Sequence, residues 1–203
     1  FVADGVLTLR LEDREERLLR EDELPLLGRH NVANALAAAL VARLVGISAE
    51  AIARGLRTAR PLPHRLEPVA DAHGVLWVND SKATNVAAAM SAILSLGRPL
   101  VLLLGGKDKG EALEPLAAAA RDRVRIAVCY GAAGPRMAAA MREGGVPTHG
   151  PEAGLTEAVA VARRTARPGD AVLLAPACSS FDEFENYEAR GRRFAALARE
   201  VAA

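Results

Sequence analysis

The chain has 203 residues with 51% hydrophobic and 25% charged side chains, and its formal net charge at pH 7 is only +1. The hydrophobic fraction is ample for a buried core, whereas the near balance of charge and the 3% aromatic content argue against a nucleic-acid partner. No apolar stretch is long enough to span a membrane, so we expect no membrane association. The two cysteines, Cys129 and Cys178, match neither a metal-ligand spacing nor a disulfide framework, and we expect a cytoplasmic protein.

The first sixty residues predict a strand followed by two helices. Residues 6–11 alternate between apolar and polar side chains, as in a half-exposed strand. A charged passage, residues 12–17, separates this strand from an alanine-rich helix that runs to about Val45. Ser48 is a suitable N-cap for a second helix over residues 49–58.

A proline-rich segment follows the second helix. Pro61 and Pro63 stand two positions apart, and proline disfavours helix in the residue before it, so the segment is expected to be extended. We place a domain boundary here, which divides the chain into residues 1–61 and residues 62–203.

Beyond this boundary the pattern predicts a hairpin and then an alternation of strands and helices. The hairpin pairs residues 65–70 with residues 75–78. Further strands are expected at 100–104, 126–130, 146–149 and 171–175, and helices from about 85, at 111–121, 135–143 and 154–166, and from about 180. Three of these strands are almost continuously apolar, as in a parallel sheet covered on both faces. The pattern therefore predicts a doubly wound, mostly parallel α/β domain.

The chain has only three lysines, Lys82, Lys107 and Lys109, against twenty-three arginines. All three lie in two loops that directly follow apolar runs. Loops at the carboxyl ends of strands bind ligands in open α/β sheets, and a lysine ammonium is a compact cation for an anion. The lysine distribution therefore indicates two candidate anion-binding loops.

Neither loop is decisive by itself. Residues 79–85 place Asp80, Lys82 and Thr84 before a helix, which suits an anionic ligand but is equally typical of a well-capped turn. Residues 105–110 are rich in glycine and lysine but lack the spacing of a phosphate-binding P-loop, so a solvated surface turn is the alternative.

A third loop, residues 176–181, also joins a strand to a helix. A nucleophilic Cys178 is disfavoured, because no nucleophile-elbow pattern or obvious histidine base accompanies it. Ser180 is more plausible as a helix cap that also binds a carboxylate. Phe181 and Tyr187 could line a small pocket, while the other aromatic side chains of the last helix fit a core stripe.

Taken together, the motifs resemble those of the Mur ligases, ATP-dependent amide-forming enzymes of peptidoglycan synthesis. Five strings carry the resemblance, in order along nearly the whole chain: residues 28–35, 62–67, 79–85, 103–106 and 176–184. The Asn-Asp-Ser-Lys-Ala-Thr-Asn string is similar to the form found in the members that add D-glutamate. The Gly-Gly-Lys-Asp-Lys string departs from a more usual Gly-Gly-Asp-x-Lys, and Lys109 is its positional match.

The resemblance implies a role for each matched residue. The residues expected to hold ATP are Asn31, Asn34, His64, Arg65 and Asp80. Those expected to hold D-glutamate are Thr84, Lys109, Ser180, Phe181 and Tyr187. Lys82 and Lys109 are the expected catalytic residues. From the residues alone, Asn31 could equally be a helix cap.

The resemblance also implies what the chain does not contain. Residues 1–61 would be the C-terminal part of a central ATP-binding domain, and residues 62–203 a C-terminal Rossmann-like domain that binds the amino acid. The UDP-binding domain, the P-loop and the Mg²⁺ ligands would lie in other segments of the same protein. The expected small-molecule partners are ATP, D-glutamate and a UDP-muramoyl peptide, and we expect the chain alone to have no ligase activity.

Two other classes of function remain open at the level of the residues. A nicotinamide-binding oxidoreductase would suit a parallel sheet, but residues 130–134 do not supply the Gly-x-Gly-x-x-Gly fingerprint. A non-catalytic ligand-binding domain is the second alternative. Binding of NAD would favour the first, and tight binding of D-glutamate without ATP would favour the second.

Overall fold

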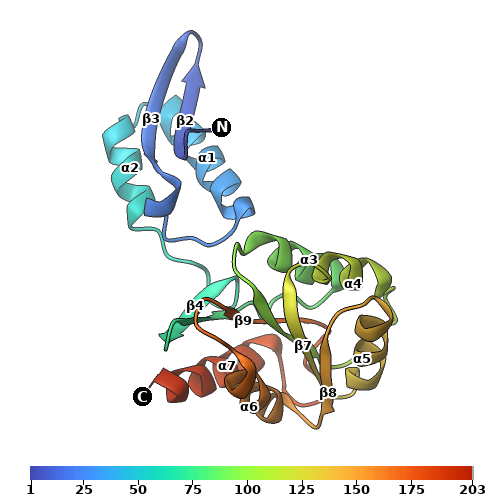
Figure 1. Cartoon of the computed structure of the whole chain (residues 1–203). Helices are drawn as coiled ribbons and strands as arrows, with labels where there is room; N and C mark the ends of the chain where they lie inside the picture. Colours follow the sequence, from blue (N-terminus) through green and yellow to red (C-terminus); the bar gives the residue numbers. More distant parts are fainter. Residues whose placement is uncertain (203) are drawn as a thin grey trace. The chain divides into compact units, whose positions relative to one another are not determined.

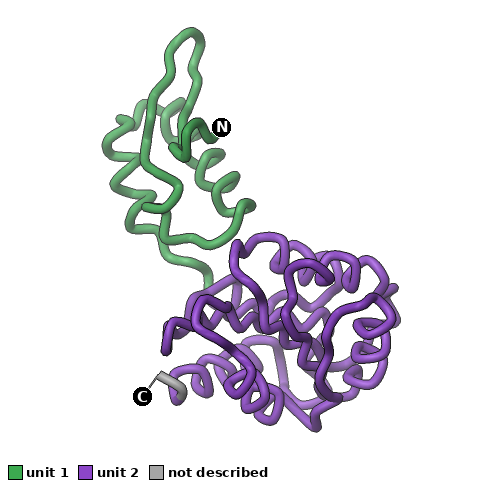
Figure 2. Tube along the Cα trace, viewed as in Figure 1, with its two compact units in different colours: residues 1–62 green, residues 63–203 purple. Residues whose placement is uncertain are grey.

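The computed structural model describes the backbone of residues 1–202 and the side chains of residues 1–200. The chain forms two compact units, residues 1–62 and residues 63–203, which are coloured separately in Figure 2. The division falls inside the proline-containing segment. No helix in the described part of the chain is both long and apolar enough to cross a membrane.

The first unit is a three-stranded antiparallel sheet with two helices. Its elements are β1 (Val2–Ala3), β2 (Val6–Leu11), β3 (Arg14–Arg20), a short 3-10 helix (Glu21–Glu23), α1 (Arg29–Leu44) and α2 (Ala49–Arg57). Ser48 caps α2 as expected, since its Oγ accepts a hydrogen bond from Ala51 N at 3.3 Å. Leucines of β2 and β3 pack against the two helices to form a small core.

The sequence pattern does not predict strand β3, because the first residues of this strand are charged. Its first residues are charged and mostly exposed, whereas Leu18 and Leu19 are buried. The exposed part pairs with β2, and Arg10 and Glu15 form an ion pair across the hairpin. The charged passage therefore belongs to a hairpin. It shows no alternation of apolar and polar residues, because the outer part of the hairpin is exposed to solvent.

The second unit is the predicted doubly wound α/β domain, which confirms the fold class. Its elements are β4 (Glu67–Ala72), β5 (Val75–Asn79), α3 (Val86–Ser95), β6 (Leu100–Gly105), α4 (Glu114–Ala120), β7 (Val124–Tyr130), α5 (Gly134–Glu143), β8 (Thr148–Glu152), α6 (Leu155–Thr165), β9 (Ala171–Ala177) and α7 (Tyr187–Ala202). The six strands are ordered β4-β5-β9-β6-β7-β8, and only the edge strand β4 is antiparallel to its neighbour.

Helices cover both faces of this sheet, as Figure 1 shows. On one face α3 packs on β9, and α5 packs on β7 and β8. On the other face α6 packs on β6 and β7, and α7 packs on β4 and β5. Strand β6 is buried along its whole length because both of its faces are covered. The core on the α6–α7 face centres on Trp77 and Phe194, whose ring centroids lie 6.0 Å apart.

The last helix begins later than the sequence predicts. Residues 180–186 form a turn rather than the first turns of α7, because Asp182 and Glu183 point away to accept hydrogen bonds from Ala132 N and Leu155 N. Asn186 then caps the helix, with its Oδ1 accepting from Ala189 N at 2.7 Å. Tyr187 is consequently the first residue of the helix and lies at the carboxyl edge of the sheet.

Gly106 holds two loops of the second unit close together, and we expect Gly106→Ala to destabilise that unit. Gly106 has a φ of +126°, and a Cβ there would collide with Ser179 O and crowd Arg190 Nη1. The strain and the overpacking together should lower the free energy of unfolding by about 2 kcal/mol or more. Denaturant titration can measure this through the fluorescence of Trp77, the single tryptophan of the chain, which is buried in this unit.

Gly97→Ala is the matched control, because a Cβ at Gly97 meets no atom within 4 Å and no positive φ has to be adopted. An equal unfolding midpoint for both variants would show that the close approach at Gly106 does not constrain the fold.

Candidate functional site

Three loops at the carboxyl edge of the second unit's sheet enclose a pocket of about 410 Å³. They follow β5, β6 and β9, three strands that are adjacent in the sheet. The residues that line the pocket are Thr84, Lys107, Asp108, Lys109, Ser179, Ser180, Phe181 and Tyr187. A crevice at this edge of a doubly wound sheet is the usual position of a ligand site.

The pocket brings together all five residues that the resemblance assigns to D-glutamate. Lys109 Nζ donates to Thr84 O at 3.0 Å, which joins the loop after β6 to the loop after β5. Ser180 is buried, whereas Phe181 is 66% exposed at the pocket. The lining therefore combines an ammonium, hydroxyls and aromatic rings.

The loops after β6 and β9 are also held together by their backbones. Lys107 N donates to Ser179 O at 2.9 Å, and Ser179 Oγ donates to Lys107 O at 3.2 Å. These bonds form a short antiparallel bridge between the two loops. Lys107 is also one of the residues that line the pocket, whereas the sequence allows it to be a solvated loop residue.

Lys82 lies beside the pocket rather than in its lining. Its Nζ lies 3.9 Å from the centroid of the Tyr187 ring, a cation–π contact. The same ring also meets the His64 ring edge-on, at a centroid distance of 6.1 Å. Tyr187 therefore contacts the pocket, the lysine ammonium and the histidine.

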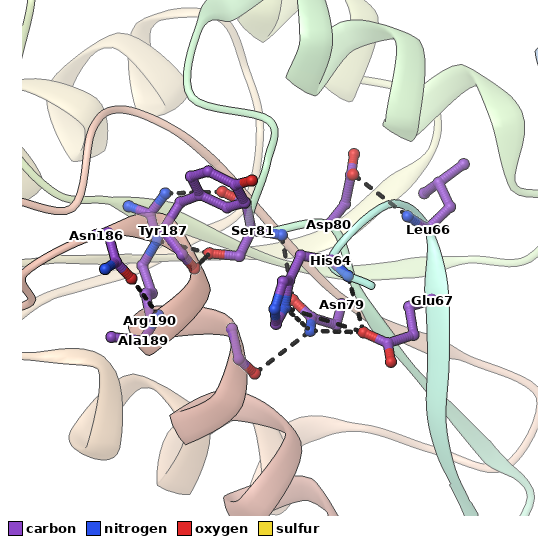
Figure 3. Close-up of polar contacts among 11 residues, drawn as sticks. His64, Leu66, Glu67, Asn79, Asp80, Ser81, Asn186, Tyr187, Ala189 and Arg190 are labelled. Atoms are coloured by element: carbon purple, nitrogen blue, oxygen red, sulfur yellow. Dashed lines mark hydrogen bonds and ion pairs between the residues drawn. The ribbon is translucent and has the colours of Figure 1, made fainter. Parts of the chain in front are cut away.

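A buried polar network surrounds His64 and Asn79, and Figure 3 shows its contacts. Ser81 N donates to Asn79 Oδ1 at 3.2 Å, which fixes the orientation of the amide. Asn79 Nδ2 therefore faces His64 Nδ1, at 2.9 Å. Glu67 Oε2 also accepts from Asn79 Nδ2, at 3.0 Å.

Asp80 is a buried carboxyl with few partners. Its Oδ1 accepts a hydrogen bond from Leu66 N at 3.3 Å, as Figure 3 shows. Burial raises the pKa of Asp80 to about 6, against the opposing effects of that hydrogen bond and of the Arg65 charge. A carboxyl that is costly to ionise in the free protein can bind hydroxyl or N–H donors from a ligand.

Arg190 is a site residue that sequence reasoning missed. Its side chain is completely buried, and it donates to Ser81 Oγ and Ser81 O and to the carbonyls of Cys178 and Ser179, at 2.9–3.2 Å. All five guanidinium N–H groups are thereby satisfied. Arg190 thus ties α7 to the loops after β5 and β9. An arginine next to a glycine in a helix gives no sequence signal for this role.

The environment of Cys178 disfavours a nucleophilic role. Its side chain is buried, and burial raises the pKa of its thiol to about 11. A thiol with such a pKa is almost entirely protonated near neutral pH and reacts poorly. The interpretation of Cys178 as a small core residue is therefore supported.

In the first unit, Asn31 and Asn34 lie in the first turns of α1. The N-cap of this helix is Gly28, so Asn31 is not the cap. Asn31 Nδ2 donates to Leu27 O at 2.7 Å, and Asn34 Nδ2 lies 3.5 Å from Asn31 Oδ1. The two amides therefore share one face of the helix, as their spacing predicts.

No group of three or more His, Cys, Asp or Glu side chains among the described residues is placed to hold a metal ion. The second unit is an α/β domain with a pocket at the carboxyl edge of its sheet, and Lys107 and Lys109 are among the residues that line this pocket.

Comparisons with known proteins identify its family. The sequence matches the family model described as Mur ligase, glutamate ligase domain, over residues 64–178. This match spans more than half of the chain, and the chain therefore belongs to the Mur ligase family.

Curated relatives agree with this assignment. The UDP-N-acetylmuramoylalanine--D-glutamate ligase of Salinibacter ruber is 45% identical over 194 residues, which cover 96% of this chain and 42% of the relative. The protein of the same name from Rubrobacter xylanophilus is 48% identical over 198 residues, which cover 96% of this chain and 44% of the relative. The chain therefore spans about two fifths of the length of these relatives.

Solved structures share the fold. The UDP-N-acetylmuramate-alanine ligase of Thermotoga maritima matches with a TM-score of 0.66 at 15% identity, over 92% of this chain and 40% of that one. A folylpolyglutamate synthase/dihydrofolate synthase from Yersinia pestis, solved with AMPPNP and a Mn ion, matches with a TM-score of 0.62 at 23% identity, over 93% of this chain and 43% of that one.

The raised pKa of Asp80 predicts a specific pH dependence of stability. The folded state binds this proton more tightly than the unfolded state does, so ionisation of Asp80 costs stability as the pH rises from about 4 to about 6. Asp80→Asn removes this cost. The free energy of unfolding of the variant, minus that of the wild type, should increase by about 2–3 kcal/mol between pH 4 and pH 7.

Denaturant titrations of both proteins across this pH range would measure the difference between their free energies of unfolding. The contributions of the other titrating groups are common to both proteins and cancel in this difference. A difference that stays constant from pH 4 to pH 7 would show that the carboxyl is as well solvated as in the unfolded chain.

Proposed function

We propose that this chain is the amino-acid-binding part of an ATP-dependent ligase that adds D-glutamate to UDP-N-acetylmuramoyl-L-alanine in peptidoglycan synthesis. One observation carries the proposal: the residues assigned to D-glutamate come from separate segments of the chain and line one pocket. The names of the relatives at 45% and 48% identity support this substrate. Because the chain spans only part of their length, the activity is proposed for the whole protein.

In the proposed reaction ATP phosphorylates the carboxylate of the muramoyl peptide, and the amine of D-glutamate attacks the resulting acyl phosphate. The tetrahedral intermediate expels phosphate and leaves an amide bond. D-Glutamate brings two carboxylates, so its pocket needs cations and N–H donors. Lys107 and Lys109 supply positive charge at the pocket, and the Asp108 carboxylate beside them is paired with Arg136.

Lys82 and Lys109 are the proposed catalytic residues. Lys109 would hold a carboxylate of D-glutamate and so orient its amine. The Lys82 ammonium, held over the Tyr187 ring, would stabilise negative charge that develops where the amine meets the acyl phosphate. Both contributions are electrostatic and require ammonium groups that are already in place before the substrate binds.

The proposed ATP-binding residues lie in both units. In the second unit the buried Asp80 carboxyl suits hydroxyl donors of a ribose, and the His64 ring and the exposed Arg65 guanidinium are additional polar groups. In the first unit Asn31 and Asn34 offer amide groups from one helix face.

A magnesium ion would accompany ATP in this reaction. Because the described residues offer no cluster of acidic or histidine side chains for it, its ligands are proposed to lie in other segments of the protein. The reaction would take place in the cytoplasm, where ATP and the UDP-linked substrate are available.

The proposed roles predict different effects for the two lysines of the same loop. In the complete enzyme Lys109→Ala should raise the KM for D-glutamate about tenfold or more, because a charge-assisted hydrogen bond is lost, and should change the KM for ATP less than about twofold. Lys107→Ala should have the smaller effect, since Lys109 is the ammonium that is bonded to Thr84 O. Steady-state kinetics with each substrate varied in turn would measure both values.

An equal increase of the two KM values in Lys109→Ala would contradict the assignment of this residue to the amino acid. Absence of D-glutamate-dependent product formation by the wild-type enzyme would contradict the proposed reaction.

A further inference from the structure

The loop that carries Lys109 is held by an arginine from a neighbouring helix. We refer to residues 107–111 as the lysine loop. Arg136 of α5 donates through Nη1 to both carboxylate oxygens of Asp108, at 2.9 and 2.8 Å. Arg136 Nη2 also donates to Glu111 O, at 2.6 Å. One guanidinium therefore contacts the lysine loop at positions on both sides of Lys109.

The position of Arg136 within its helix favours an anionic partner from outside that helix. Arg136 lies in the first turn of α5, which has no acidic residue in that turn. A cation there is opposed by the positive end of the helix dipole, so it is unfavourable without an anion. Asp108 supplies that anion from the lysine loop.

Asp108 in turn shapes the backbone of the loop. Its Oδ1 accepts a hydrogen bond from Gly110 N at 2.9 Å, across Lys109. This hydrogen bond and the Arg136 charge hold the pKa of Asp108 below its ordinary value. The carboxylate is therefore ionised at neutral pH, and it bridges the guanidinium and the backbone on which Lys109 stands.

The end of the lysine loop is tied to a second helix. Glu111 Oε2 accepts a hydrogen bond from Val86 N at 3.1 Å, in the first turn of α3. The start of the loop is bonded to Ser179 through the backbone of Lys107. With both ends attached, the remaining freedom lies in the Asp108–Lys109–Gly110 segment, which is the part that Arg136 and Asp108 restrain.

We propose that Arg136 is a positioning residue for Lys109, which acts by fixing the lysine loop through Asp108 and Glu111 O. This inference rests on the proposed function, because it assigns Arg136 to the binding of the amino-acid carboxylate. The fixed loop places the Lys109 ammonium 3.0 Å from Thr84 O before the substrate arrives. Affinity for the amino acid is then not reduced by the cost of ordering the loop.

The complete enzyme provides the test. Arg136→Ala should raise the KM for D-glutamate about three- to tenfold and leave the KM for ATP within about twofold. Arg142→Ala is the matched control, since Arg142 lies on the same helix and donates to Gly150 O at 2.7 Å, rather than to the lysine loop. The control should keep both KM values. An unchanged KM for D-glutamate in Arg136→Ala overturns the inference.

A double variant separates positioning from simple cancellation of charge. Arg136→Ala combined with Asp108→Asn removes both charges together and therefore leaves no unpaired carboxylate near the pocket. If Arg136 positions the loop, the double variant keeps a raised KM for D-glutamate. Recovery of the wild-type KM would show that Arg136 only neutralises Asp108, and would overturn the positioning role.

A failure of this inference can be distinguished from a failure of the proposed function. A wild-type enzyme without D-glutamate-dependent activity would refute the function itself. An active enzyme in which Lys109→Ala is impaired for D-glutamate and Arg136→Ala is not would refute only the role of Arg136.

Discussion

The candidate site depends on a single buried cation. Arg190 is completely buried, and in the described part of the chain no carboxylate forms an ion pair with it. Its charge is instead balanced by the carbonyl dipoles of Ser81, Cys178 and Ser179. A buried guanidinium is stable only if every N–H is satisfied, so each of these carbonyls must keep its place. The loops after β5 and β9 are thus fixed by the arginine that they solvate.

This constraint explains why the pocket consists of loops that are nevertheless well defined. The loop after β9 is fixed by Arg190 and is bonded in turn to the loop after β6, through Ser179 and Lys107. Gly106 must be a glycine because no Cβ fits between that backbone and Ser179 O. The polar network of His64 and Asn79 extends the same arrangement to the edge strand. The rigid strands therefore fix the positions of the side chains that are proposed to contact a ligand.

The sequence predicts the features that depend on local pattern. Continuous apolar runs indicate the buried strands, and Ser48 indicates a helix start that the structure has. Features that depend on distant partners are not predicted. Strand β3 forms because it pairs with β2, and residues 180–186 form a turn because the N–H groups of Ala132 and Leu155 donate hydrogen bonds to it. Two of the hydrogen bonds that satisfy the buried Arg190 likewise go to Ser81, which is more than one hundred residues away in the chain. Patterns of period two or 3.6 contain no information about such partners.

Composition alone does not distinguish the three lysines, but each of them is held by a different contact in the structure. The Lys82 ammonium is held by an aromatic face, which leaves its donors available to a ligand. The Lys109 ammonium is held by a carbonyl, and its loop by Arg136. Lys107 is bonded to Ser179 through its backbone, and its side chain is exposed. Because the entropy lost on binding is smallest for a charge that is already fixed, the best-restrained ammonium should contribute most to binding an anion.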